Sequence, residues 1–532
     1  MPLAMSMLIS SVIPNAAQTQ LFQLGFLLIT VTLVTALFQI VQNIAVLRLQ
    51  DKWGAPLQAA LWQRLLNLPV SFFRSYTAGD LGMRVMGINA IQQTLSGTVV
   101  GSLLAGIISL ISFGLLFYFD ARLALIAGAL VLVAVGATLL AGLLQVRYQR
   151  QMVELEGRLA GLVLQTITGI SKFRVAGAEN RAFAAWAADF GRSKQITYRA
   201  RNVTNNLVVF NAGFSLLTTA AIFSIVSAAG RGTFATGTFL AFNAAFIQLL
   251  MAMLALSRAI VSVLNIVPTY ERLRPVMLTL PELDDLKTHP GELNGRIEVS
   301  HVSFRYSAEK PPVLKDVSLT INPGEFVAIV GTSGSGKSTL LRLLLGFETP
   351  ETGAIYYDNN DLAGLDIRAT RRQIGVVLQN GSVMPGDIFH NIVGTSTLTL
   401  DDAWAAATMA GLDKDIRQMP MGMHTVITAS GSTLSGGQRQ RLLIARAIVN
   451  KPRVIFFDEA TSALDNTTQS IVAESLDNLQ ATRIIIAHRL STIINADRIY
   501  VMDKGEIVES GNYTELMAQK GVFAKLAERQ II

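Results

Sequence analysis

The first half of the chain is dominated by long segments that contain no Lys, Arg, Asp or Glu. The first charged residue is Arg48, and the whole chain is only 15% charged, against about 25% in a typical soluble domain. A bilayer core of about 30 Å is crossed by about 20 apolar residues in a helix. We therefore predict transmembrane helices in the charge-free runs 21–46, 85–119, 123–146, 202–230 and 232–257.

The charges between these runs predict their orientation. The connections 48–84 and 147–201 carry nearly all the Lys and Arg of this half, whereas the turns at 14–20, 120–122 and 231 carry only Arg122 and Arg231. Because positive loops stay on the cytoplasmic side, the long connections are predicted to be cytoplasmic. A helix over 85–119 would be about 50 Å long, so these helices are expected to project beyond the bilayer.

The result is an all-α membrane domain of five full spans and a partial first one, Pro2–Ile13. Those first residues rise only about 18 Å as a helix, which is short of the hydrocarbon core. We therefore expect the natural chain to begin upstream. The alternative is a genuine short first helix.

Composition excludes several kinds of chemistry. The chain has no cysteine, which rules out disulfides, thiolate metal sites and a cysteine nucleophile within it, and its 5 histidines show no paired spacing. The net charge of +7 is explained by the basic membrane loops rather than by a nucleic-acid partner. Uncharged polar residues inside the spans either line a substrate path or form hydrogen bonds between helices: Gln39, Gln42, Gln92, Gln93, Asn205, Asn206, Asn211, Asn243 and Gln248.

A phosphate-binding loop is predicted in the second half, where the sequence fits G-x-x-x-x-G-K-S/T. An apolar run at 325–330 precedes it as a strand, and 340–345 follows as a helix. The glycines let backbone N–H groups turn inward around a phosphate. Lys337 is predicted to reach the β- and γ-phosphates and Ser338 to ligate Mg²⁺; an ordinary Gly/Ser turn is the alternative. The loop consists of Gly331, Thr332, Ser333, Gly334, Ser335, Gly336, Lys337, Ser338 and Thr339.

Three further apolar strands end in side chains that suit phosphate hydrolysis. The run 454–457 leads to Asp458, predicted to bind Mg²⁺, and to Glu459, predicted to polarise the attacking water as a general base. Gln379 ends another strand and is placed to reach Mg²⁺ and the water. His488 ends the third and is placed to hydrogen-bond the γ-phosphate. Strands and helices alternate from residue 296, which predicts an α/β domain with these residues at the strands' carboxyl ends.

Two more segments complete the predicted site. Tyr306 precedes the loop and is an aromatic ring able to stack on adenine, although alone it would more often be a packing residue of a strand. A polar, glycine-rich turn opens the helix 441–449 and forms a second helix N-terminus able to hold phosphate. Its predicted nucleotide-binding residues are Ser435, Gly436, Gly437 and Gln438.

These elements, in this order, resemble the ATP-binding-cassette family. The resemblance identifies Tyr306 as the A-loop, 331–339 as Walker A, Gln379 as the Q-loop, 434–438 as the signature, Asp458 with Glu459 as Walker B, 462–465 as the D-loop and His488 as the H-loop. It implies ATP and Mg²⁺ as ligands, and two cassettes that pair head to tail, so that Ser435 and Gly437 act on the partner's nucleotide. It also implies a P-loop nucleotide-binding domain at 296–529, after a membrane domain at 1–270 and a linker at 271–295.

The first half resembles the membrane domain of type I exporters, with 72–81 and 169–181 similar to their coupling-helix regions. The phrases at 11–15, 72–81 and 431–435 resemble the bacteriocin-system (NHLM-type) peptide exporters. The chain departs from the exporter pattern at 428–432, where exporters often carry a glutamate. This departure puts the usual cross-talk with the partner's coupling helix in question.

The resemblance implies a half-transporter in the bacterial inner membrane, with its cassette in the cytoplasm. Its partner is a second half-transporter, in a homodimer or a heterodimer, surrounded by membrane lipid. We expect ATP-driven export of a bacteriocin-like peptide. A lipid or amphipathic-drug exporter is an alternative, and an ATP-gated channel or regulator is an alternative of another class.

Overall fold

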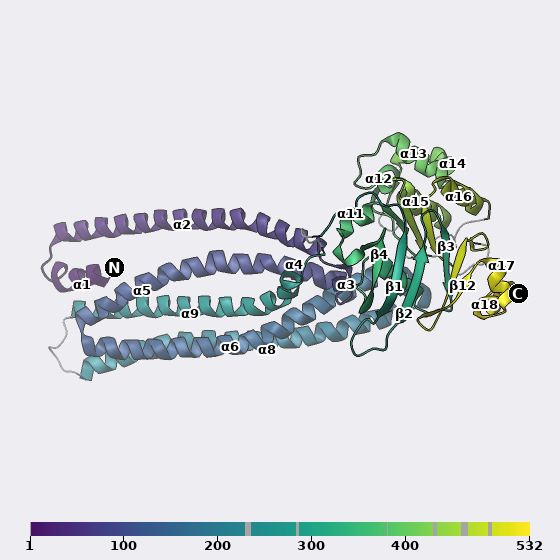
Figure 1. The fold of residues 1–532 in the computed structure, drawn as a ribbon. Helices are drawn as coiled ribbons and strands as arrows, with labels where there is room; N and C mark the ends of the chain where they lie inside the picture. Colours follow the sequence, from purple (N-terminus) through teal and green to yellow (C-terminus); the bar gives the residue numbers. More distant parts are fainter. Residues whose placement is uncertain are drawn as a thin grey trace. The chain divides into compact units, whose positions relative to one another are not determined.

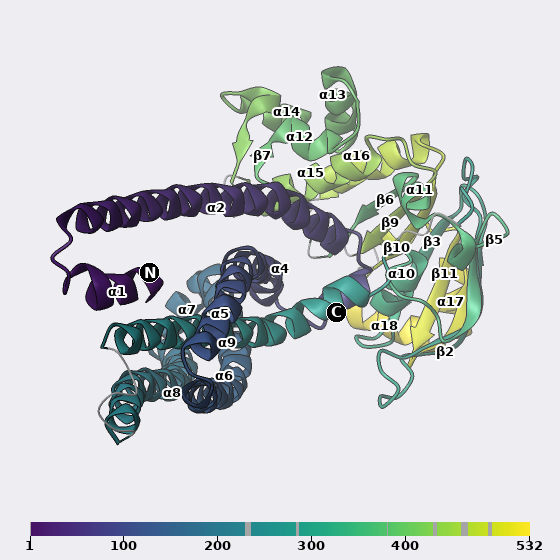
Figure 2. The same cartoon turned by 90° about the vertical axis from the view of Figure 1, so that its left-hand side faces the viewer.

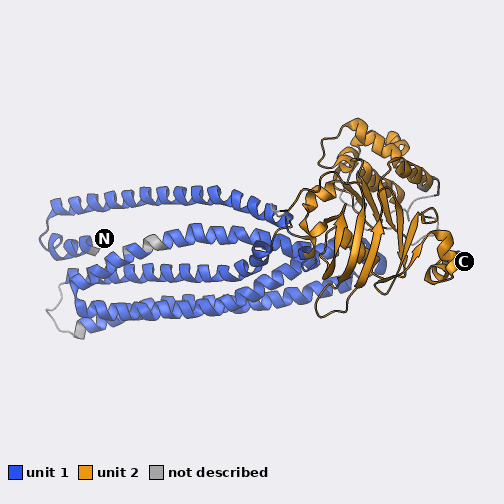
Figure 3. Ribbon diagram, in the orientation of Figure 1, with its two compact units in different colours: residues 1–68, 72–280 blue, residues 69–71, 281–532 orange. Residues whose placement is uncertain are grey.

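The structure, a computed structural model, describes residues 2–228, 236–282, 287–379, 381–428, 434–458, 466–487 and 492–531. The chain divides into two compact units, shown in Figure 3. Unit 1 comprises Met1–Leu68 and Phe72–Leu280, and unit 2 comprises Pro69–Ser71 and Pro281–Ile532. The domain limits predicted from the sequence remain a proposal.

In its described residues, unit 1 contains helices and no strand (Figure 1). The predicted turn at 14–17 lies between the helical segment that ends at Val12 and the helix that begins at Gln18, and Ala16 in this turn has a φ of 48°. Asp120 separates two membrane helices and caps the second, because its carboxylate accepts a hydrogen bond of 2.8 Å from the Leu123 amide. The helices are α1 (Pro2–Met7), η1 (Leu8–Val12), α2 (Gln18–Leu66), α4 (Ala78–Gln93), η2 (Thr94–Val99), α5 (Val100–Phe119), α6 (Ala121–Thr168), α7 (Ile170–Ala176), α8 (Glu179–Ala228) and α9 (Thr236–Leu278), with α3 (Val70–Phe73) between α2 and α4.

Four of the described helices, α2, α6, α8 and α9, are long and apolar enough to cross a membrane. The charge-free α5, of 20 residues, continues η2 and α4 without a break in the helical backbone. The four long helices have 43 to 50 residues, which corresponds to lengths of about 65–75 Å. They exceed the hydrocarbon core about twofold, and the predicted membrane fold with projecting helices is confirmed.

An apolar core joins four of these helices near one end of the bundle. Leu116 of α5, Ala124 of α6, Ile222 of α8 and Phe246 of α9 are members of this cluster, and each is almost fully buried. Asp120 joins α5 to α6 at this end, in a turn predicted to face away from the cytoplasm. Figure 2 shows α1 beside α9 in the same bundle, and the two helices are in contact.

Unit 2 is an α/β structure built on a six-stranded sheet of order β12-β11-β3-β10-β9-β6. Five of these strands run parallel, and β12 pairs antiparallel with β11 at one edge. A four-stranded sheet has the order β2-β1-β4-β5. The strands are β1 (Ile297–Phe304), β2 (Leu314–Ile321), β3 (Phe326–Gly331), β4 (Thr352–Tyr357), β5 (Asn360–Asp361), β6 (Ile374–Val377), β7 (Gly386–Asp387), β8 (Val426–Ile427), β9 (Val454–Asp458), β10 (Thr482–Ile486), β11 (Arg498–Asp503) and β12 (Glu506–Gly511).

Both faces of the six-stranded sheet are buried, as near-continuous apolar strands require. In β3, Ala328 belongs to the core on one face and Val327 and Ile329 to the core on the other. In β9, Phe457 and Phe456 divide between the two cores in the same way. The helices of unit 2 are α10 (Lys337–Leu344), η3 (Leu362–Gly364), α11 (Ile367–Arg372), α12 (Ile388–Val393), α13 (Leu400–Met409), α14 (Asp413–Gln418), η4 (Gly422–His424), α15 (Gly436–Ile448), α16 (Asn466–Asn478), α17 (Tyr513–Gln519) and α18 (Val522–Ile531).

Candidate functional site

The predicted phosphate loop joins the end of β3 to the start of α10. Gly331, Gly334 and Gly336 have φ values of 154°, 82° and 105°, which L side chains rarely adopt. A Cβ at Gly331 would collide with the carbonyl oxygen of Met502, and one at Gly336 would lie 2.7 Å from the Leu314 side chain. The loop conformation therefore requires glycine at both positions.

Lys337, the first residue of α10, is 5% exposed. Its Nζ donates hydrogen bonds of 2.9 Å to the carbonyl oxygens of Gly331 and Thr332. The ammonium group thus lies against the backbone at the start of the loop, beside the N-terminus of α10. A buried ammonium and a helix N-terminus are two features that favour a bound phosphate.

The strand register brings the other predicted residues to the same edge of the sheet. β10 lies between β3 and β9, and its Ile486 is paired with both Ile329 and Asp458. Asp458 is only 8% exposed, so its carboxylate is largely shielded from solvent. Beyond it, Val377 at the end of β6 is paired with Phe457, which puts Gln379 two residues past the same edge.

A cavity of about 300 Å³ lies over the loop, and Gln379 and Lys337 are among the residues that line it. Glu459 and His488, predicted as the general base and the γ-phosphate ligand, lie outside the described residues. Each directly follows a described segment at this edge, since β9 ends at Asp458 and β10 at Ile486.

Tyr306 lies beside the phosphate loop. Its hydroxyl is 3.1 Å from the Oγ1 of Thr339, and its ring packs edge-on against Phe304 at 5.0 Å between centroids. Tyr306 is 37% exposed, so part of the residue is accessible to a ligand. The hydrogen bond to Thr339 was not predicted from the sequence, because the two residues are 33 positions apart.

The predicted signature forms the start of α15. Ser435 is the N-cap: its Oγ accepts a hydrogen bond of 3.2 Å from the Gln438 amide, while Gln438 Oε1 accepts one of 3.0 Å from the Ser435 amide. This reciprocal pair satisfies two backbone donors at the helix start. Ser435 and Gly436 are exposed and Gly437 is half-buried, so this helix end is open. Of the segment 428–432 ahead of it, which lacks the glutamate, residues 429–432 lie outside the described residues.

Sequence reasoning missed the side chains that hold the signature helix in place. Asp415 of α14 accepts a hydrogen bond of 2.8 Å from Gln438 Nε2 and forms an ion pair of 3.0 Å with Arg441. Farther along α15, Arg446 donates two hydrogen bonds of 2.6 Å to Asn391, and burial lowers the pKa of this guanidinium. No local sequence motif predicts these contacts, because each joins residues more than 20 positions apart.

Comparison with known proteins covers both units. Residues 1–253 match the ABC transporter transmembrane region, and residues 314–462 match the ABC transporter family. The chain is 33% identical over 484 residues to the leukotoxin export ATP-binding protein LtxB of Aggregatibacter actinomycetemcomitans. It is 35% identical over 486 residues to the alpha-hemolysin translocation ATP-binding protein HlyB of Escherichia coli O157:H7. Both alignments cover 89% of this chain and 68% of the relative.

The fold agrees with these matches. A solved structure of a bacterial Atm1-family ABC exporter with ATP bound superimposes with a TM-score of 0.89, covering 100% of this chain and 95% of that one, at 26% identity. Membrane helices and an α/β cassette therefore follow one another here as they do in that exporter. The chain belongs to the ABC transporter family, as an exporter half whose ATPase is coupled to transport.

Proposed function

We propose that this chain is half of a bacterial inner-membrane exporter that moves a peptide out of the cytoplasm. The hydrolytic part rests on one observation: the phosphate loop, Gln379 and Asp458 meet at a single sheet edge in a chain that also carries membrane-spanning helices. The peptide cargo rests on the resemblance to bacteriocin-system exporters. It is also supported by the printed names of relatives that export leukotoxin or translocate alpha-hemolysin.

The described residues fit ATP with a divalent cation. The glycine loop presents backbone N–H groups, Lys337 supplies a positive charge, and Tyr306 supplies an aromatic surface for adenine. Ser338, Gln379 and Asp458 would hold Mg²⁺, which would neutralise phosphate charge. Thr332, Ser333, Gly334, Ser335 and Thr339 complete the loop around the phosphates.

Glu459 would orient and polarise the attacking water as a general base, and His488 would hydrogen-bond the γ-phosphate. Lys337 and Gln379 would act in the same step, by holding the γ-phosphate and the water in line. The protein's contribution is therefore positioning and electrostatic stabilisation at one fixed edge of the sheet.

The second half-transporter would complete each site. The open N-terminus of α15, with Ser435, Gly436, Gly437 and Gln438, would bind the nucleotide held by the partner's phosphate loop. The architecture of one membrane unit and one cassette implies such a dimer. Membrane lipid would surround the apolar spans, and the cassette would lie in the cytoplasm.

The cargo is tested with the purified chain in proteoliposomes whose cassettes face outward. Peptides encoded next to this gene are added with ATP, and peptide inside the vesicles is measured after external protease treatment. We expect ATP-dependent accumulation that Lys337→Ala abolishes. Stimulation of hydrolysis by lipids or amphipathic drugs alone would replace the peptide assignment. An ATP-gated ion current without accumulation of any cargo would contradict export itself.

A further inference from the structure

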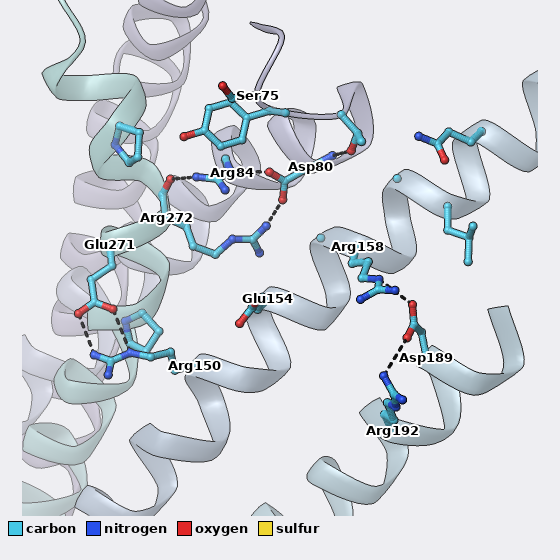
Figure 4. A pocket seen from close by; sticks show the side chains of 18 of the residues that line it. Ser75, Asp80, Arg84, Arg150, Glu154, Arg158, Asp189, Arg192, Glu271 and Arg272 are labelled. Carbon is cyan, nitrogen blue, oxygen red and sulfur yellow. Dashed lines mark hydrogen bonds and ion pairs between the residues drawn. The ribbon is translucent and has the colours of Figure 1, made fainter. Parts of the chain in front are cut away.

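Helix α6 of unit 1 is held to its neighbours by different forces at its two ends. Near the predicted outer end, α5, α6, α8 and α9 share the apolar core that includes Leu116 and Phe246, both fully buried. Toward the predicted cytoplasmic end, α4, α6, α8 and α9 border a cavity of about 1070 Å³. Five arginines and four carboxylates line this cavity, many of them visible in Figure 4.

Asp80 of α4 is the centre of a polar contact among three helices. Its carboxylate pairs with Arg84 of the same helix at 2.6 Å and with Arg272 of α9. Arg272 also donates to the carbonyl oxygen of Val153 of α6, and Arg84 donates to the carbonyl oxygen of Arg272 at 2.6 Å. The side chains of Asp80, Arg84 and Arg272 are only 13–17% exposed.

Glycines allow α4 and α6 to approach closely enough for this contact. A Cβ at Gly157 of α6 would collide with Arg272 and Asp80, and one at Gly161 would lie 2.6 Å from the Oγ1 of Thr77. A Cβ at Gly79 would lie 2.8 Å from the backbone of Ala160. These positions therefore hold the smallest residue where the start of α4 lies against α6.

The contact of α6 with α4 and α9 suits an interface that separates and re-forms. Helices α4 and α9 themselves share an apolar core with α2, in which Val85 and Leu273 are fully buried, so these two helices stay together. Ionic and polar groups that part beside a cavity lined by charged residues can be rehydrated, whereas parting an apolar core exposes hydrocarbon to water. Asp80 would keep both Arg84 and Arg272 as partners when α6 leaves. The apolar core at the other end then serves as the pivot.

We propose that Arg272, held in place by Asp80, and the Val153 carbonyl form a latch between α9 and α6 that opens and closes in each transport cycle. Asp80 and Arg272 are positioning residues: they do not touch nucleotide but determine whether α6 moves together with α4 and α9. The proposal rests on ATP-coupled movement of the membrane helices and holds for any cargo.

The latch is tested by an engineered disulfide. The chain has no cysteine, and a Cβ at Gly161 would lie 3.4 Å from the Cβ of Thr77, close to the range of about 3.5–4.5 Å in disulfides. Thr77→Cys with Gly161→Cys is reconstituted in nanodiscs, and MgATP hydrolysis is measured after oxidation and again after reduction. We expect oxidation to lower the rate at least about tenfold and reduction to restore it. Each single cysteine variant should be unaffected by the oxidant.

Full hydrolysis by the oxidised pair, with loss of free thiols demonstrated, would overturn the latch. If the reduced double-cysteine variant hydrolyses no ATP while wild type does, the rate of disulfide formation is measured instead. We expect that rate to differ at least about fivefold between nucleotide-free protein and protein that holds a non-hydrolysable ATP analogue with Mg²⁺, a state that needs no turnover, and equal rates would overturn the proposal.

Asp80 itself is tested in the same double-cysteine background. Asp80→Asn should erase the difference in disulfide formation rate between the two states. Gly82→Ala is the matched control on α4, because a Cβ at Gly82 contacts nothing within 4 Å, and it should preserve the difference. A difference that survives in Asp80→Asn would contradict the role of the Asp80 carboxylate.

Discussion

At the scale of single residues, the proposed chemistry separates binding from hydrolysis. Glu459→Gln should retain ATP binding and lose steady-state hydrolysis by at least about 100-fold, because general-base catalysis typically contributes about 10²–10⁴-fold. Lys337→Ala should instead weaken nucleotide binding, since it removes the ammonium group at the phosphate loop. Nucleotide binding and phosphate release are measured on the same nanodisc preparations. Near wild-type turnover in Glu459→Gln would disprove the assignment.

Tyr306 allows its ring and its hydroxyl to be tested separately. Tyr306→Phe loses the hydrogen-bond contact with Thr339 but keeps the aromatic surface, so the KM for ATP should change by less than about twofold. Tyr306→Ala loses a stacking interaction worth about 1–3 kcal/mol per base, so KM should rise about 5- to 150-fold. Equal KM values in the two variants would show that adenine does not stack on this ring.

Residue identities at the site were predictable because each lies in a short local pattern. Walker A occupies nine consecutive positions, and Asp458 directly ends an apolar strand. The contact between Asp80 and Arg272 was not predictable, because 192 positions separate them. Such pairs follow from how helices pack, and no local spacing encodes that packing.

At the scale of elements, charge-free runs were sufficient to locate the membrane helices. The run 85–119 was predicted as one helix, and the backbone is helical throughout, but Thr94–Val99 forms a π-helical segment between α4 and α5. The Thr94 and Ser96 hydroxyls donate to the carbonyl oxygens of Ala90 and Gln92, at 2.9 and 2.7 Å. Such bonds compete with the regular backbone hydrogen bonds of the α-helix. The spacing of apolar residues in the sequence does not predict them.

Helix α13 provides a stability prediction outside the nucleotide site. Thr399 is the N-cap of this helix. The Asp402 carboxylate accepts a hydrogen bond of 2.9 Å from the Thr399 amide and another from the Thr399 hydroxyl. Both hydrogen bonds lower the pKa of Asp402. Thr399→Ala should lower the free energy of unfolding by about 1 kcal/mol. Thr408→Ala, at an exposed position on the same helix, is the control and should lower it less.

The same cap has a defined pH dependence. Because the pKa of Asp402 is lower folded than unfolded, its stabilisation is present above the unfolded value, about 3.9, and is lost as pH falls through the folded value. The difference in thermal midpoint between wild type and Asp402→Asn should therefore shrink below about pH 4. A constant difference from pH 7 to pH 3 would contradict this linkage.

At the scale of the whole molecule, one chain leaves surfaces that require other molecules. The most apolar segment of α2 is not buried within the chain, and Phe22 and Phe26 are 78% and 74% exposed. Apolar surface of this extent is covered by lipid or by a second half-transporter. Fold and dimeric architecture follow from sequence, but the cargo and the partner's identity do not, since both depend on surfaces outside this chain.

Composite sites shared by two chains are the central claim, and mixing two inactive variants tests it most directly. Lys337→Ala disables the phosphate loop and Ser435→Arg disables the signature, so neither homodimer has an intact site. A mixed dimer has one phosphate loop and one signature that are both intact, and they face each other if the signature acts in trans. We predict that co-expressed, doubly tagged mixed dimers recover up to about half of wild-type MgATP hydrolysis, one site of two. Mixed dimers that are shown to form and yet hydrolyse no more ATP than either variant alone would contradict the account.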